Sequence, residues 1–182
     1  MHFAAIGTRE PSPEQVAQLQ RWLDGLARDR SHAVLHTGAC TGVDQLAALH
    51  WWSLGGDVYL HLPWPSYERQ WVENVRGEFG HMRCQLDSPS EPAADASRLA
   101  ALHHPRWDSL GRGPRSLHAR NVEIVRPVTL GVMAFPGSSR WGGGTAMGMK
   151  LALHLGRTLR VCDPLARTWD TCGCPVEDAT PW

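Results

Sequence analysis

Hydrophobic residues along this chain alternate between short continuous runs and stretches with helical spacing. The short runs predict strands at Phe3–Ile6, 33–37, 58–62, 128–135 and 158–162. Apolar residues spaced three or four apart predict helices at 13–28, 43–54, 66–75, 117–125 and 145–155. The order Ser12-Pro13-Glu14 is typical of a helix start, with a capping hydroxyl, a proline in the first turn and an acid beside it.

The alternation of strands and helices predicts an α/β fold. We expect a Rossmann-like open parallel sheet of about five or more strands, with helices on both faces, because successive βαβ units make parallel strands with right-handed crossovers. Residues 1–162 form one expected domain, with an irregular insertion at about 80–115 and a short helix near 96–102. The insertion is either a binding loop or a solvated excursion. Residues 163–182 are expected to form a C-terminal tail.

The balance of charges and the lengths of the apolar runs limit the kinds of partner that this chain is expected to bind. The 182 residues include 18 basic and 18 acidic side chains, so the net charge is zero. This balance argues against binding nucleic acid or a membrane by charge alone, although a local basic patch stays open. The chain lacks an apolar run of the ~18 residues that span a bilayer and lacks a recognisable leader, so we expect a cytoplasmic protein.

The five cysteines are odd in number and scattered, as in proteins of a reducing compartment. Cys172 and Cys174 form a C-x-C pair that Cys162 or a histidine could complete as a soft-metal site. Zinc sites usually show two pairs at wider spacing, so we expect tail thiols, no metal and no cofactor.

Glycine-rich turns follow several predicted strands, at 7–10, 37–44 and 137–145. The carboxyl ends of parallel strands meet at one edge of the sheet, where ligands bind. Helix starts there offer N–H groups to an anion, and glycines allow close approach. The alternative is a set of tight turns in which Asp44 caps a helix. The turns match neither G-x-x-x-x-G-K-[ST] nor G-x-G-x-x-G, which argues against a P-loop enzyme or a dinucleotide dehydrogenase.

The segments GTR, HTGACTGVDQLAA, ARN and GGGT, in this order, resemble the SLOG superfamily, and most closely its YspA-type members. The superfamily also includes DprA proteins, LOG enzymes and molybdenum-cofactor carriers. The resemblance covers about residues 3–162, apart from the insertion, and implies a nucleotide or nucleotide-derived ligand at the carboxyl edge of the sheet. The expected ligand- or phosphate-binding residues are Gly7, Thr8, Arg9, Thr37, Gly38, Thr41, Gly42, Arg120, Asn121, Gly142, Gly143, Gly144 and Thr145.

One departure from the LOG pattern concerns catalysis. LOG enzymes carry a glutamate three residues after the threonine of their glycine motif, and Gly148 stands there in this chain. We therefore expect a sensor or ligand-handling protein. The alternatives are an enzyme that cleaves the N-glycosidic bond of a nucleoside monophosphate, a DprA-like single-stranded DNA binder and a molybdenum-cofactor carrier.

If the protein is an enzyme, Asp44 is the expected catalytic carboxylate, with Glu10 and Glu68 as the other candidates. The helix start beside Asp44 predicts a lowered pKa. Histidines and arginines at 103–118 leave a nucleic-acid partner open but not favoured, and helix faces permit a homo-oligomer.

Overall fold

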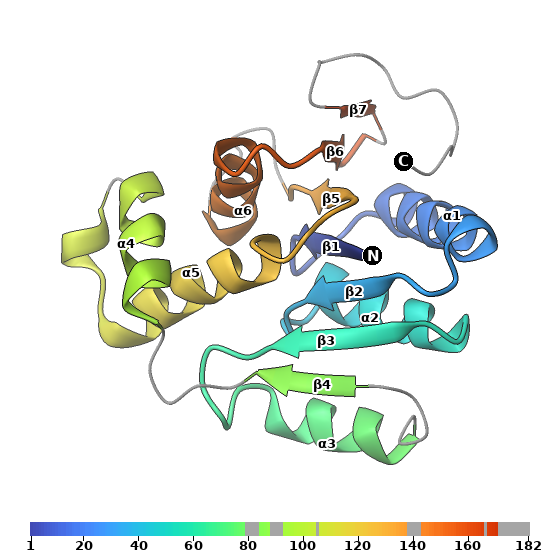
Figure 1. Ribbon diagram of the computed structural model, residues 1–182, viewed down its shortest axis with the longest axis horizontal. Coiled ribbons are helices and arrows are strands. Elements are labelled where there is room, and N and C mark those ends of the chain that lie inside the picture. Colours follow the sequence, from blue (N-terminus) through green and yellow to red (C-terminus); the bar gives the residue numbers. More distant parts are fainter. Residues whose placement is uncertain (79–83, 88–92, 105, 138–142, 166, 171–182) are drawn as a thin grey trace.

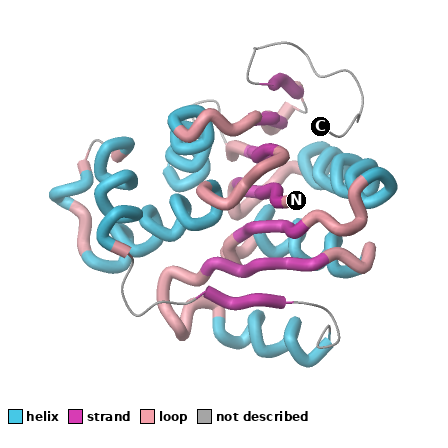
Figure 2. The backbone as a smooth tube through the Cα atoms, in the orientation of Figure 1, coloured by secondary structure: helices cyan, strands magenta, loops and turns pink. Residues whose placement is uncertain are grey.

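The computed structural model describes residues 1–78, 84–87, 93–104, 106–137, 143–165 and 167–170. Its strands form one sheet in the order β4-β3-β2-β1-β5-β6-β7 (Figures 1 and 2). The strands are β1 (His2–Gly7), β2 (Val34–Thr37), β3 (Asp57–His61), β4 (Cys84–Asp87), β5 (Gly131–Phe135), β6 (Leu159–Cys162) and β7 (Thr168–Asp170). All neighbouring pairs are parallel except β6 and β7. The predicted Rossmann-like α/β fold is confirmed.

Helices cover both faces of this sheet. They are α1 (Pro13–Asp29), α2 (Val43–Ser53), α3 (Arg69–Glu78), α4 (Ala94–His103), α5 (Arg112–Val125) and α6 (Gly143–His154). A short 3-10 helix, η1 (Trp107–Ser109), precedes α5. The helix start at Ser12 is confirmed, because the Ser12 hydroxyl accepts the Gln15 N–H and the Gln15 side chain accepts the Ser12 N–H.

Two apolar clusters fix the layers. On one face, Phe3 and Leu35 of the sheet pack with Leu23 of α1 and Trp51 of α2. On the other face, the cluster joins strands β1, β5 and β6 to α5 and α6. Residues Phe3 to Ile6 of β1 are all buried, and successive side chains along a strand point to opposite faces. Both faces of the sheet are therefore covered by helices.

The structure departs from the sequence prediction in two segments. The described part of residues 80–115 contains the expected short helix, as α4, but also β4, η1 and the first turn of α5, where irregular structure was expected. The expected tail at 163–182 contributes β7, so the sheet extends past residue 162. Strands of three or four residues at a sheet edge are too short to show a period, and this is why the sequence pattern missed them.

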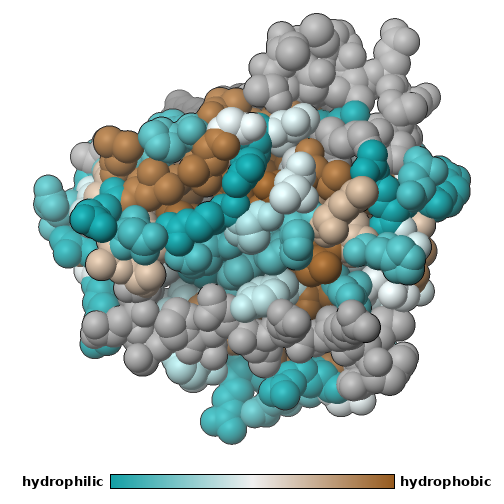
Figure 3. All heavy atoms as spheres, in the orientation of Figure 1, coloured by the Kyte–Doolittle hydropathy of each residue, from teal (hydrophilic) through white to brown (hydrophobic). Residues whose placement is uncertain are grey.

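The outer helices α4 and α6 expose apolar side chains. Leu102 and Leu153 keep 68% and 51% of their surface exposed, and apolar residues gather over these helices in Figure 3. Among the described helices, none combines the length and the apolar character that crossing a membrane requires. An association between copies of the chain stays a prediction.

Candidate ligand pocket at the carboxyl ends of β1 and β5

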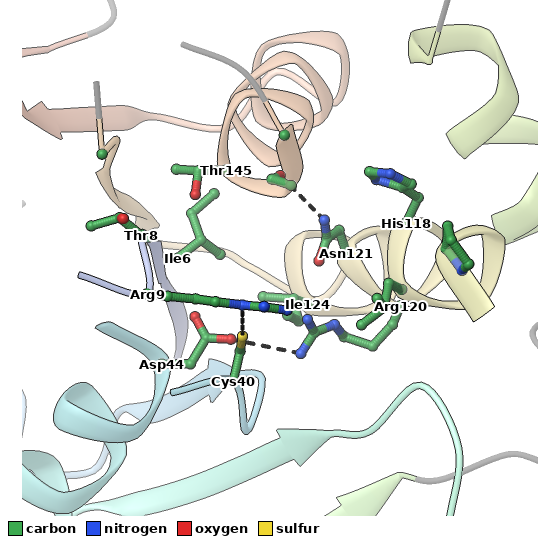
Figure 4. A pocket seen from close by; sticks show the side chains of 16 residues that line it. Ile6, Thr8, Arg9, Cys40, Asp44, His118, Arg120, Asn121, Ile124 and Thr145 are labelled. Atoms are coloured by element: carbon green, nitrogen blue, oxygen red, sulfur yellow. Dashed lines mark hydrogen bonds and ion pairs between the residues drawn. The ribbon is translucent and has the colours of Figure 1, made fainter. Parts of the chain in front are cut away.

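The strand order changes direction next to β1, because β2, β3 and β4 lie on one side of it and β5, β6 and β7 on the other. In open α/β sheets, such a switch point leaves a crevice at the carboxyl ends of the strands. A pocket of about 570 Å³ occupies this place (Figure 4). Its lining residues are Ile6, Gly7, Thr8, Arg9, Cys40, Asp44, Pro114, Leu117, His118, Arg120, Asn121, Ile124, Gly137, Gly143, Gly144 and Thr145.

Three of the glycines expected to face a ligand serve loop packing. A Cβ on Gly38 would overlap the Arg120 guanidinium and the Asp44 carboxylate. Gly42 has φ +98° and lies against the backbone of Thr8 and Arg9, while a Cβ on Gly7 would overlap the Val43 side chain. The absence of Cβ atoms therefore lets the β1–α1 and β2–α2 loops close on each other. Gly38 and Gly42 lie behind the residues that line the pocket.

A buried ion pair forms the floor of the pocket. Arg120 Nη1 lies 3.7 Å from Asp44 Oδ2, and each side chain keeps 8% of its surface exposed. The same Nη1 donates to the His61 carbonyl oxygen at 3.2 Å. The Asp44 carboxylate also accepts the backbone N–H groups of Gly7 and Cys40. The pair therefore ties α5 to the first two loops and to the end of β3.

The expectation of a lowered Asp44 pKa is wrong. Burial raises the pKa of this carboxyl from 3.8 to about 6, against the opposing effects of Arg120, the two backbone hydrogen bonds and Arg9. Removing a carboxylate from water disfavours its charged form, and here this cost exceeds the gain from the partners. Asp44 does lie at the pocket, as expected, but as an acid that titrates near neutral pH.

Arg9 is exposed and crosses the pocket above Asp44 (Figure 4). Its Nε donates to Cys40 Sγ at 3.2 Å, and this hydrogen bond is the main cause of a raised Arg9 pKa, with Tyr67 contributing. The contacts of this guanidinium are thus a thiol and a phenol. Arg9 is held close to the pocket floor while its charge stays in the cavity.

The opposite wall is the start of α6. Gly143 has φ +74° with open space around it, so the glycine serves a backbone conformation that other residues rarely adopt. Thr145 lies in the first turn, where backbone N–H groups have no partner within the helix. Asn121 Nδ2 donates to the Gly144 carbonyl oxygen at 3.2 Å and ties α5 to this turn. Gly142 and the Cys172–Cys174 pair lie outside the described residues.

Two of the expected hydroxyls lie elsewhere. Thr37 is fully buried, and its Oγ1 donates to the Ala5 carbonyl oxygen at 2.9 Å. Thr41 is exposed and is not among the lining residues. Thr8 and Thr145 do line the pocket, together with Arg9, Arg120 and Asn121.

One face of α5 contributes lining residues that the sequence did not suggest. Pro114, Leu117, His118 and Ile124 share the pocket with Arg120 and Asn121. Their spacing of three, four and seven residues is that of one helix face, so a helical projection anchored on Asn121 could have found them. Burial, with the charges of His104 and Arg120, lowers the pKa of His118 and favours its neutral ring.

No family model and no curated protein matches this chain. Solved structures do match this chain. DNA processing protein A (DprA) from Helicobacter pylori matches with a TM-score of 0.56 and 17% identity, over 88% of this chain and 64% of that one. DprA from Streptococcus pneumoniae matches with a TM-score of 0.52 and 14% identity, over 88% and 49%. The chain has a DprA-like fold. It spans less than two thirds of either neighbour, and identities this low show the fold alone.

Proposed function

We propose that the pocket binds a nucleotide or nucleotide-derived ligand through its phosphate. The observation that carries the proposal is the meeting of Arg9 with the start of α6 in one cavity. The hydrogen bonds of Arg9 go to a thiol and a phenol rather than to a carboxylate, although the Asp44 carboxylate attracts its charge. A helix start adds N–H donors and a partial positive charge. Such a pair of groups suits a phosphate.

The rest of the lining suits a sugar and a base. Ile6, Leu117 and Ile124 supply apolar surface, while Asn121 and His118 supply polar groups on the same wall. The Asn121 amide nitrogen is engaged by Gly144, which leaves its carbonyl oxygen as an acceptor. A volume of about 570 Å³ lies within the range of small-molecule pockets.

Calorimetric titration with AMP and with adenosine tests the proposal. We expect Arg9→Ala to weaken AMP binding by about one to two decades, because a charge-assisted hydrogen bond is worth roughly 1.5–3 kcal/mol. Adenosine binding should change little. Arg28→Ala is the matched control, since Arg28 is an exposed arginine in the last turn of α1.

Equal losses of AMP and adenosine affinity in Arg9→Ala would place Arg9 away from the phosphate. Wild-type protein that binds AMP no more tightly than adenosine would contradict the phosphate site itself.

Single-stranded DNA is the second candidate. The Helicobacter neighbour is described by its single-stranded DNA binding mode, and Arg112 lies exposed at the start of α5, two residues before the lining residue Pro114. A strand could then place one phosphate in the pocket and the next along α5. A competition experiment distinguishes the two ligands. The DNA hypothesis is favoured if an oligothymidylate displaces AMP, binds at least about tenfold more tightly than AMP and loses affinity strongly as salt is added.

A further inference from the structure

Cys40 occupies an unusual position in the pocket. It lies in the loop between β2 and α2, it is partly exposed, and its side chain lies beside Arg9 and Asp44 (Figure 4). A cysteine in a cavity is accessible to small reagents, whereas a core cysteine is not. What distinguishes Cys40 from an ordinary surface thiol is the set of groups around its sulfur.

Hydrogen-bond donors converge on this sulfur. Arg9 Nε donates to Cys40 Sγ at 3.2 Å. The Tyr67 hydroxyl lies beside Cys40 and Arg9 and feels the charge of Arg120, and Tyr67 keeps 9% of its surface exposed. Burial, together with Cys40, raises the pKa of Tyr67, which keeps its hydroxyl protonated and able to donate.

One of these donors lacks an acceptor of good geometry. Among the described residues, the buried Tyr67 hydroxyl has no hydrogen bond that satisfies distance and angle. Buried polar atoms are nearly always paired, and leaving one without a partner is unfavourable. The Tyr67 hydroxyl beside Cys40 therefore has room for an acceptor atom that the thiol does not provide.

We propose that Cys40 is a modification site, at which hydrogen peroxide oxidises the sulfur to a sulfenic acid and thereby closes the pocket to a phosphate. The sulfur of the deprotonated thiol attacks one peroxide oxygen, an S–O bond forms and the O–O bond breaks. The departing hydroxide takes up the thiol proton as water, so two electrons pass from sulfur to peroxide. A small thiol condenses with the sulfenic acid to give a mixed disulfide and water, and a second molecule of the thiol then releases the Cys40 thiol and leaves as the small-molecule disulfide.

The geometry explains both parts of the proposal. The neighbouring guanidinium attracts negative charge, and partly exposed cysteines beside arginine are the reactive ones in proteins. The new oxygen supplies the acceptor that the Tyr67 hydroxyl lacks. It also lies beside Arg9, the guanidinium that the proposed phosphate would contact, so the loss of phosphate binding rests on the proposed function.

Trapping with dimedone tests the modification by itself. After treatment of the full chain with hydrogen peroxide, peptide mass spectrometry should find the adduct on Cys40. Cys162 is the internal control, because it is fully buried and burial raises the pKa of its thiol to about 12. We expect Tyr67→Phe, which removes one donor and keeps the ring, to slow the Cys40 reaction. Labelling of Cys40 no faster than Cys162 would overturn the proposal.

Titration with AMP before and after peroxide tests the closure. We expect oxidation to weaken AMP binding by at least about tenfold, with recovery after thiol treatment. The affinity of Cys40→Ser for AMP should be the same before and after peroxide. If oxidised wild type carries the Cys40 adduct and binds AMP unchanged, the closure is refuted. If untreated wild type binds no AMP, the proposed function fails, and the dimedone result alone decides the modification.

Discussion

Asn in place of Asp44 tests whether this buried acid is held in a costly ionised state. The carboxyl has a pKa of 3.8 in an unfolded chain and about 6 in the fold. An acid with a raised pKa binds more protons in the folded state, so its contribution to stability is present below pH 3.8 and is lost as the pH rises through 6. At 1.4 kcal/mol per unit, the full loss is about 3 kcal/mol.

Asp44→Asn removes the charge and nearly keeps the shape. The amide retains one acceptor for the N–H groups of Gly7 and Cys40 and loses the other, which adds a constant cost at every pH. The constant cost cancels when the stability difference between variant and wild type at one pH is compared with that at another, so the change of this difference with pH is the quantity to measure. Between pH 4 and pH 7, the variant should gain about 2 kcal/mol of stability relative to wild type.

Urea unfolding followed by tryptophan fluorescence measures this difference, since Trp22, Trp51 and Trp52 are buried in the core. Free energies of unfolding for both proteins at pH 4, 5.5 and 7 give the profile. Asp29→Asn, at an exposed position near the end of α1, corrects for the general effect of removing one negative charge. Taking differences at each pH removes the contribution of the histidines, which titrate in the same range.

Two results would refute the reasoning. A difference that stays constant from pH 4 to pH 7 would mean that burial does not raise the Asp44 pKa. A variant that becomes relatively less stable at pH 7 would mean that Arg120 outweighs burial, so that the pair is a stabilising ion pair. The same proteins settle the catalytic role: we expect wild type to release no free base from nucleoside monophosphates, and clear turnover that falls by orders of magnitude in Asp44→Asn would make Asp44 catalytic.

Two further predictions concern the pocket wall and the sheet. Gly143→Val should abolish AMP binding in calorimetry. Gly156→Val is the control, because Gly156 has a similar positive φ just past the other end of α6; it should be strained by the same amount, about 1–2 kcal/mol, and still bind AMP. Equal AMP affinities of the two variants would place the site away from α6. His36 hydrogen-bonds to His2 and His61 at 2.8 and 2.9 Å, and burial lowers its pKa to about 4. Its neutral form is the stable one, so wild type should lose about 1–2 kcal/mol as the pH falls from 6.5 to 4, and His36→Asn less, in urea unfolding.

Local patterns were sufficient to predict most of the fold. The sequence predicted the strand β5 from its apolar run and the start of α1 from its capping residues, and the structure confirms both. Such predictions succeed because helix and strand periods and capping depend on neighbours within a few residues. The order of the turns also placed Arg9 and Thr145 at one edge of the sheet, since parallel strands share a carboxyl edge.

Only the tertiary structure decided what each residue at that edge does. Gly38 and Gly143 both lie in glycine-containing turns that follow a strand. In the structure, Gly38 makes room for a buried ion pair, whereas Gly143 forms an open wall of the pocket. The direction of the Asp44 pKa shift depends on burial by α5 and on Arg120, 76 positions away in the chain. Cys40 and Tyr67 become neighbours only when two loops fold together. Burial and long-range contacts arise when distant segments pack together. The spacing of apolar residues every two or 3.6 positions depends only on near neighbours, so it does not predict them.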